Sequence, residues 1–95
     1  MKYNEKSSLK EIEDYIDSTY GQHYVGQNGV QTLDLLHAIG ISQQTCQGNV
    51  IKYMARWGKK NDFSRMDLVK AAHYIILLMH FSRENENGSS KDSDD

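Results

Sequence analysis

Four polar side chains recur along residues 48–60 at a spacing that places them together if the segment is helical. They are Asn49, Lys52, Arg56 and Lys59. At about 100° per residue they share roughly a quarter of the helix circumference. Lysine and arginine attract phosphate oxygens, arginine through a bidentate fork, and an asparagine amide can donate to the same oxygens. The pattern predicts a site for a small anion, to which Lys60 can also contribute.

The other side of the same predicted helix is apolar. It carries Val50, Tyr53, Met54 and Trp57. We therefore expect this side to pack against the rest of the protein and the polar stripe to face a ligand. Two ordinary alternatives remain, namely a solvated helix surface for the whole stripe and capping of the helix C-terminus for Lys59 and Lys60.

Hydrophobic periodicity predicts an all-α protein, a small bundle of about four helices. The sequence Ser8-Leu9-Lys10-Glu11 has the spacing of a capping box and predicts the start of the first helix. Gly40 and Gly58 are expected to end the second and third helices. The predicted helices cover residues 8–21, 33–39, 42–57 and 64–84, the last opening at Asp62 or Ser64.

A glycine-bearing stretch, residues 21–31, separates the first two helices. It predicts a flexible loop that turns sharply or approaches a ligand closely. The loop contains His23 next to Tyr24. This pair could stack on a base, donate to a phosphate, or anchor the loop against the core. Both residues are candidate ligand contacts, with the anchoring role left open.

The predicted fourth helix is apolar around most of its circumference between Leu68 and Phe81. Three short neighbours in a chain of 95 residues are not expected to cover such a helix on all sides. We therefore expect a homo-oligomer that associates through this C-terminal helix. Residues 85–95 are polar and acidic without an aromatic residue, so we expect one helical domain, residues 1–84, and a disordered acidic tail.

Composition and charge restrict the function. The net charge is −2, yet residues 47–73 hold six Lys or Arg against two acids. A basic segment inside an acidic chain favours a compact anion over duplex nucleic acid. The single cysteine, Cys46, is expected to be a small buried apolar side chain in a reducing compartment. The longest apolar run is far below the roughly 20 residues that a membrane span requires.

Motifs of common catalytic sites are absent from the sequence. It contains no phosphate loop, no nucleophile elbow and no His-Glu-x-x-His zinc motif. We therefore predict no catalytic residue, no metal site and no cofactor, and we favour a binding protein over an enzyme.

Several short motifs in combination carry a resemblance to known proteins. They are His23-Tyr24, Gly48-Asn49, Lys52-Tyr53, Arg56, Gly58-Lys59-Lys60, Asp67-Leu68, Lys70-Ala71 and Tyr74. Over residues 22–80 the chain resembles a family of small bacteriophage proteins whose best-known member is a nucleotide kinase that lacks a phosphate loop. It is also similar to small phage sponge proteins that sequester the cyclic dinucleotide signals of bacterial antiviral (CBASS) immunity. Both resemblances imply a nucleotide phosphate as the ligand.

The favoured hypothesis is a phage-encoded, non-enzymatic protein that sequesters a cyclic di- or oligonucleotide in the host cytoplasm. In this hypothesis Lys52 and Arg56 bind the phosphates, while His23 and Tyr24 close over the bases. A first alternative is a nucleoside monophosphate kinase that uses the same residues with Mg²⁺, although the chain is short for binding donor and acceptor nucleotides together. A second alternative is a helical adaptor that binds a host protein.

Overall fold

The computed structural model describes residues 2–21, 32–59 and 62–89. This part of the chain contains four helices and no β-strand, apart from one isolated bridge between Lys59 and Asp62. The helices are α1 (Glu5–Gly21), a short helix over residues 32–38, α3 (Ser42–Arg56) and α4 (Arg65–Ser89). The predicted all-α bundle is confirmed for these residues.

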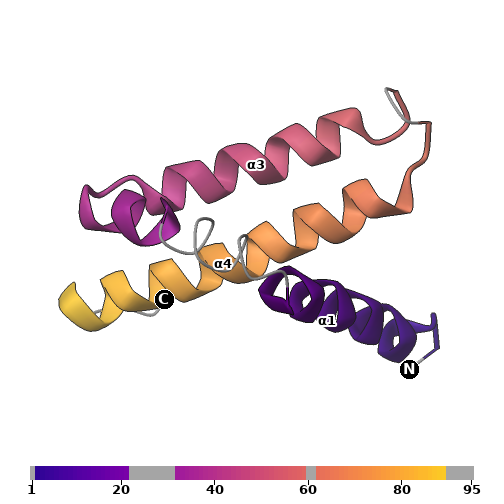
Figure 1. Ribbon diagram of the computed structural model, residues 1–95, viewed down its shortest axis with the longest axis horizontal. Coiled ribbons are helices and arrows are strands. Elements are labelled where there is room, and N and C mark those ends of the chain that lie inside the picture. Colours follow the sequence, from indigo (N-terminus) through magenta and orange to yellow (C-terminus); the bar gives the residue numbers. More distant parts are fainter. Residues whose placement is uncertain (1, 22–31, 60–61, 90–95) are drawn as a thin grey trace.

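Helices α3 and α4 run side by side in opposite directions and form a hairpin, and α1 lies against the first half of α4 (Figure 1). An ion pair fixes α1, because the Glu11 carboxylate accepts two hydrogen bonds from Nε of Arg65, at 2.8 and 2.9 Å. Farther along, the Tyr15 ring meets the His73 ring edge-on, with centroids 5.7 Å apart. The three long helices therefore meet along α4.

The start of α1 differs from the prediction. The helix begins at Glu5 instead of Ser8, and the backbone N–H of Ser8 already donates to the Asn4 carbonyl at 3.0 Å. Oε1 of Glu5 accepts from the backbone N–H of Tyr3. The predicted capping box at Ser8 is wrong because its Glu11 carboxylate binds Arg65 of α4 and does not return to the helix start.

Glycines end two of the helices, as the sequence predicts. Gly40 has φ of +87°, and two hydrogen bonds form the Schellman arrangement around it: Gly40 N–H to the His37 carbonyl at 3.0 Å and Ile41 N–H to the Leu36 carbonyl at 2.9 Å. Gly58 has φ of +85° and follows Trp57, the C-terminal cap of α3. Both positions use the left-handed region that glycine enters without a Cβ clash.

Replacing Gly58 with alanine is expected to lower the free energy of unfolding by about 1–2 kcal/mol, because a Cβ is disfavoured at positive φ. A Cβ at this position would also lie 3.0 Å from Cε1 of Phe63. Urea denaturation measures the change. Gly48→Ala is the matched control, since a Cβ there meets nothing within 4 Å and alanine favours the helix interior. Equal effects of the two substitutions would contradict this explanation.

The two ends of α4 also differ in detail from expectation. The helix begins at Arg65, directly after Ser64: the Asp67 N–H donates to the Ser64 carbonyl at 3.2 Å, and the Asp67 carboxylate lies near Arg56 of α3 instead of capping the helix start. At the other end α4 continues to Ser89, so residues 85–89 are helical rather than part of a tail. Nothing in the sequence stops the helix at Glu84, since the chain contains no proline. Residues 90–95 lie outside the described part.

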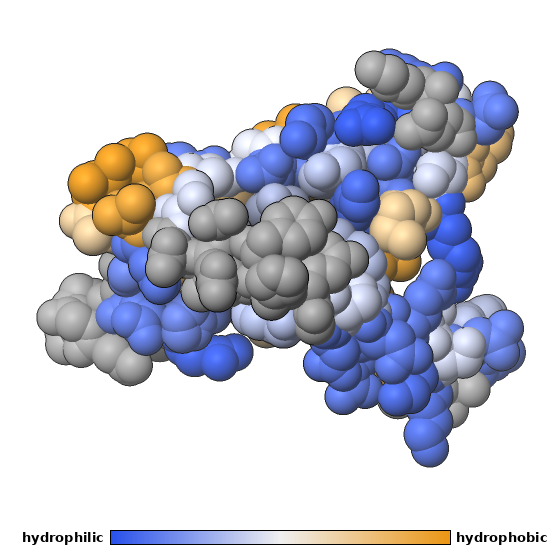
Figure 2. All heavy atoms as spheres, in the orientation of Figure 1, coloured by the Kyte–Doolittle hydropathy of each residue, from blue (hydrophilic) through white to orange (hydrophobic). Residues whose placement is uncertain are grey.

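Few apolar side chains of the described residues are fully covered. The buried ones are Cys46, Val69, Ala71 and Phe81. Cys46 has no exposed surface, and burial raises the pKa of its thiol, so the prediction of a buried apolar role is confirmed. Many large apolar side chains remain exposed, and Figure 2 shows an apolar patch where the helix over 32–38 leads into α3, formed by Leu35, Ile39 and Ile41. None of the described helices is long and apolar enough to cross a membrane.

Candidate functional site

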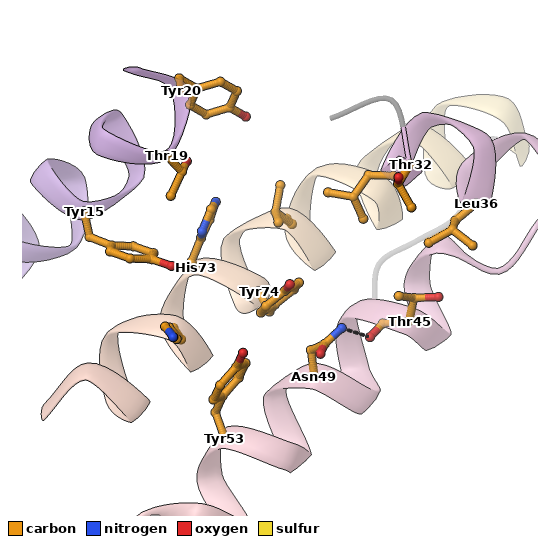
Figure 3. A pocket seen from close by; sticks show the side chains of 13 residues that line it. Tyr15, Thr19, Tyr20, Thr32, Leu36, Thr45, Asn49, Tyr53, His73 and Tyr74 are labelled. Atoms are coloured by element: carbon orange, nitrogen blue, oxygen red, sulfur yellow. Dashed lines mark hydrogen bonds between the residues drawn. The ribbon is translucent and has the colours of Figure 1, made fainter. Parts of the chain in front are cut away.

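A pocket of about 500 Å³ opens where all four helices of the described part come together (Figure 3). Tyrosines from three helices line it, namely Tyr15 and Tyr20 of α1, Tyr53 of α3 and Tyr74 of α4. The remaining polar lining comes from Thr19, Thr32, Thr45, Asn49, Lys70 and His73. A volume of this size is within the range of sites for small molecules. The pocket therefore combines aromatic surface with hydrogen-bonding groups at the scale of one small ligand.

One wall of the pocket is aromatic and uncharged at neutral pH. Burial raises the pKa of Tyr15 and of Tyr74, so both phenols keep their protons. Burial lowers the pKa of His73, so its imidazole is neutral at pH 7. The ring of Tyr74 also stacks on the ring of Tyr53, with a centroid distance of 6.1 Å and an angle of 14° between the planes. This wall can contact a flat heterocycle and exchange neutral hydrogen bonds with it.

Positive charge gathers around the ring of Tyr53. Nζ of Lys52 lies 4.7 Å from the ring centroid, Cζ of Arg56 lies 5.6 Å from it, and Nζ of Lys70 lies 5.6 Å from it. Each distance is within the range of a cation–π contact. Figure 3 places Tyr53 at one end of the pocket and Thr32 and Leu36 at the other, so the charge lies at one end.

These three cations differ in how far their charge is balanced. Nε of Arg56 lies 4.0 Å from Oδ1 of Asp67 on α4. Neither Lys52 nor Lys70 forms an ion pair with an acid in the described ranges. Two lysines without an acidic partner beside one aromatic ring provide a place where an anion would be attracted.

The structure brings part of the predicted site together. Asn49 lines the pocket and donates one amide hydrogen to the Thr45 carbonyl at 3.0 Å, while Lys52 and Arg56 flank the neighbouring Tyr53. Lys59 is exposed in the turn after α3 and does not line the pocket. The other three predicted residues, His23, Tyr24 and Lys60, lie outside the described residues.

The prediction of which face of α3 packs is wrong in part. On the expected packing side Val50 and Tyr53 are half-buried, whereas Met54 and Trp57 are 47% and 37% exposed. Asn49 and Arg56 of the polar stripe are half-buried as well. The reason is the nature of the partner surface. The buried residues of α3 are the small Ser42 and Cys46. From α4, Asp67 lies beside Arg56 of the polar stripe, and Tyr74 stacks on Tyr53.

Sequence reasoning missed the contribution of α4 to the site. Lys70, His73 and Tyr74 all line the pocket, yet their positions in the sequence predicted no individual role for them. One signal could have marked Lys70, since it is the only lysine or arginine between residues 66 and 82, a stretch that is mostly apolar. A charged side chain in such a stretch usually has an interaction partner, and here the ammonium group of Lys70 lies over the Tyr53 ring.

Acidification is expected to reduce stability through His73. Its pKa in the folded protein is lowered from 6.5, so the unfolded chain takes up the proton first as the pH falls. The contribution of the neutral imidazole is therefore fully present above about pH 6.5 and is lost progressively below it. Urea denaturation of wild type and His73→Gln at pH 7.5 and 5.5 measures this loss, which should be smaller in the variant. The two proteins share every other titratable group, so the difference between them reports on position 73. An identical pH dependence in the two proteins would contradict the assignment.

The fold and the pocket define a small all-α protein with an aromatic site that is positively charged at one end. The chain belongs to the DUF3310 family, described as a protein of unknown function, whose pattern matches residues 18–76. This range contains the whole lining of the pocket except Tyr15 and Leu77. Searches of the curated proteins and of the solved structures found no match.

Proposed function

We propose that this protein binds a nucleotide in the pocket between its helices. The observation that carries the proposal is the grouping of Lys52, Arg56 and Lys70 around Tyr53, next to a wall of neutral aromatic side chains. A nucleotide carries a flat heterocyclic base at one end and a phosphate at the other. The base is suited to the neutral aromatic wall, and the phosphate is suited to the group of cations. The base would lie against Tyr53 or Tyr74, and the phosphate would bind the three cations.

In the finer form of the proposal, the protein is encoded by a phage and acts without catalysis. It sequesters a cyclic di- or oligonucleotide immune signal in the host cytoplasm. The resemblance of the motifs around Asn49, Lys52 and Arg56 to phage sponge proteins supports this form. Tyr20 and Thr32, which precede and follow the sequence segment containing His23 and Tyr24, both line the pocket, and this also supports the proposal. Lys59 would then contribute only long-range attraction.

A cyclic dinucleotide carries two phosphates, whereas each chain groups its cations at one end of one pocket. Two chains related by a two-fold axis would offer the same residues to both halves of such a ligand. The proposal therefore includes self-association. Exposed apolar side chains on α4, namely Ile75, Ile76 and Met79, support an interface on this helix.

A thermal melting screen tests the proposal. The probes are the monophosphates of adenosine, guanosine, cytidine, uridine and thymidine, together with cyclic di-AMP and cyclic di-GMP. A ligand at a hundred times its Kd should stabilise the folded protein by about 2.7 kcal/mol. Stabilisation by a cyclic dinucleotide supports the sponge form, and stabilisation by monophosphates alone supports binding of single nucleotides.

Two further outcomes separate the alternatives. Conversion of a monophosphate to a diphosphate in the presence of ATP and Mg²⁺ would identify a nucleoside monophosphate kinase. A melting temperature that no probe changes would contradict nucleotide binding and favour the adaptor for a host protein.

A further inference from the structure

A buried carboxylate lies behind the basic cluster and belongs to no site described so far. Asp67 is 3% exposed, and its Oδ2 atom has no hydrogen-bond partner among the described residues. In the same part of the chain the nearest opposite charge is Arg56, whose Nε atom is also buried without a hydrogen bond and lies 4.0 Å from Oδ1. Burial of a charge in this way is costly unless another group balances it.

Two ordinary roles for Asp67 explain its position only in part. It occupies the first turn of α4, where a negative charge interacts favourably with the helix dipole. A capping box would require its carboxylate to accept from the Ser64 N–H, but the carboxylate turns toward α3 instead. The helix dipole favours an acid in the first turn without requiring that it be buried or face an arginine.

The guanidinium group of Arg56 has two edges that can each bind an anion. Asp67 faces the edge that carries Nε. The Arg56 side chain is about one third exposed, and its Cζ lies beside the Tyr53 ring together with the Lys52 and Lys70 side chains. A carboxylate on the Nε edge leaves the outer edge available to an anion at the end of the pocket.

We propose that Asp67 is a positioning residue that holds Arg56 from behind, so that the outer edge of its guanidinium group faces a bound phosphate beside Tyr53. This inference rests on the proposed nucleotide binding and specifies how one of its residues is oriented. Asp67 itself does not touch the ligand, because its carboxylate is buried between α3 and α4. Its effect on binding passes entirely through Arg56.

Asp67→Asn tests this role because the two possible effects have opposite signs. Removal of a negative charge near an anion site should strengthen anion binding by simple electrostatics. Loss of the group that orients Arg56 should weaken it, and we expect Kd to rise about ten-fold. Calorimetric titration uses whichever probe of the melting screen stabilises the wild-type protein most. Asp62→Asn is the matched control, since it removes an exposed acid in the turn between α3 and α4 and asparagine tolerates the positive φ of 53° there.

Arg56→Lys provides the second arm of the experiment. Lysine keeps the positive charge but lacks the two-edged guanidinium group that Asp67 is proposed to orient. In the Arg56→Lys background, Asp67→Asn should therefore change Kd little further. Circular dichroism and thermal melting establish that each variant is folded.

Equal or tighter binding by Asp67→Asn would overturn the positioning role and leave nucleotide binding intact. The positioning role is also overturned if Asp67→Asn weakens binding equally in the wild-type and Arg56→Lys backgrounds. A wild-type protein that binds none of the probes would overturn the proposed function, and the positioning role with it.

Discussion

Replacing Lys52 and Lys70 together with glutamine is expected to weaken nucleotide binding by a hundred-fold or more. Each lysine provides a charge-assisted interaction with phosphate, worth about 1.5–3 kcal/mol, and each ten-fold change in Kd corresponds to about 1.4 kcal/mol. Neither lysine forms an ion pair with an acid in the described part of the chain, so their removal should leave the fold intact. Calorimetric titration at a fixed, low salt concentration measures the change, because salt weakens such interactions.

A control variant must remove the same charge at a distance from the pocket. Lys2→Gln with Lys6→Gln meets this requirement, since both residues are exposed, neither forms an ion pair with an acid in the described part of the chain, and neither lines the pocket at Tyr53. We expect its affinity to remain within about two-fold of wild type, a difference well below 1 kcal/mol. If both double variants lose affinity equally, general electrostatic attraction accounts for binding and the pocket assignment is contradicted.

The second large effect concerns stability. Arg56→Ala is expected to lower the free energy of unfolding by about 2–3 kcal/mol, since it leaves the buried Asp67 carboxylate without its nearest positive charge. For a domain of this size the melting temperature should fall by roughly 10–20 °C. The expected loss in the free energy of unfolding is smaller than for a fully buried ion pair, because the Arg56 side chain is 35% exposed.

A second substitution separates this cause from general loss of packing. In the Arg56→Ala/Asp67→Asn double variant the orphaned charge is gone, so part of the stability should return. A double variant as unstable as the sum of the two single variants would contradict the explanation. Arg56→Ala is expected to lower stability as well as remove a proposed ligand contact, so loss of binding by this variant does not by itself identify that contact. The lysine substitutions are expected to leave the fold intact and therefore avoid this problem.

The two helix ends marked by a glycine were the most predictable part of the fold. Gly40 and Gly58 both adopt positive φ and end their helices, a role that depends on the local backbone alone. The start of α1 was not predictable in the same way. The Ser8–Glu11 pattern is a valid capping box in isolation, but Arg65, more than fifty residues away in sequence, binds the Glu11 carboxylate instead.

The candidate site shows the same division between local and distant information. The spacing of Asn49, Lys52 and Arg56 placed these side chains on one side of a helix, and the structure does bring them near one another. What this side faces depends on α4. The acid at position 67 brings Arg56 of the polar side into the contact with α4, while Tyr74 stacks on Tyr53 of the apolar side. Helical periodicity alone assigns apolar residues to the core and misses this arrangement.

The pocket itself could not be derived from any local pattern. Its lining extends from Tyr15 to Leu77 and depends on where α1 crosses the α3–α4 hairpin. The charge of Lys70 and the neutral state of His73 acquire meaning only when the Tyr53 ring and the surrounding burial are known.

The most direct test of the central claim is an NMR titration of the isotope-labelled protein with the probe that stabilises it most. Binding in the pocket predicts that the largest chemical-shift changes occur at Asn49, Tyr53, Lys70 and Tyr74. The exposed side of α3 around Ile51 and Met54 should change little. Shift changes confined to that exposed side, or none with any nucleotide, would contradict the claim that this pocket binds a nucleotide.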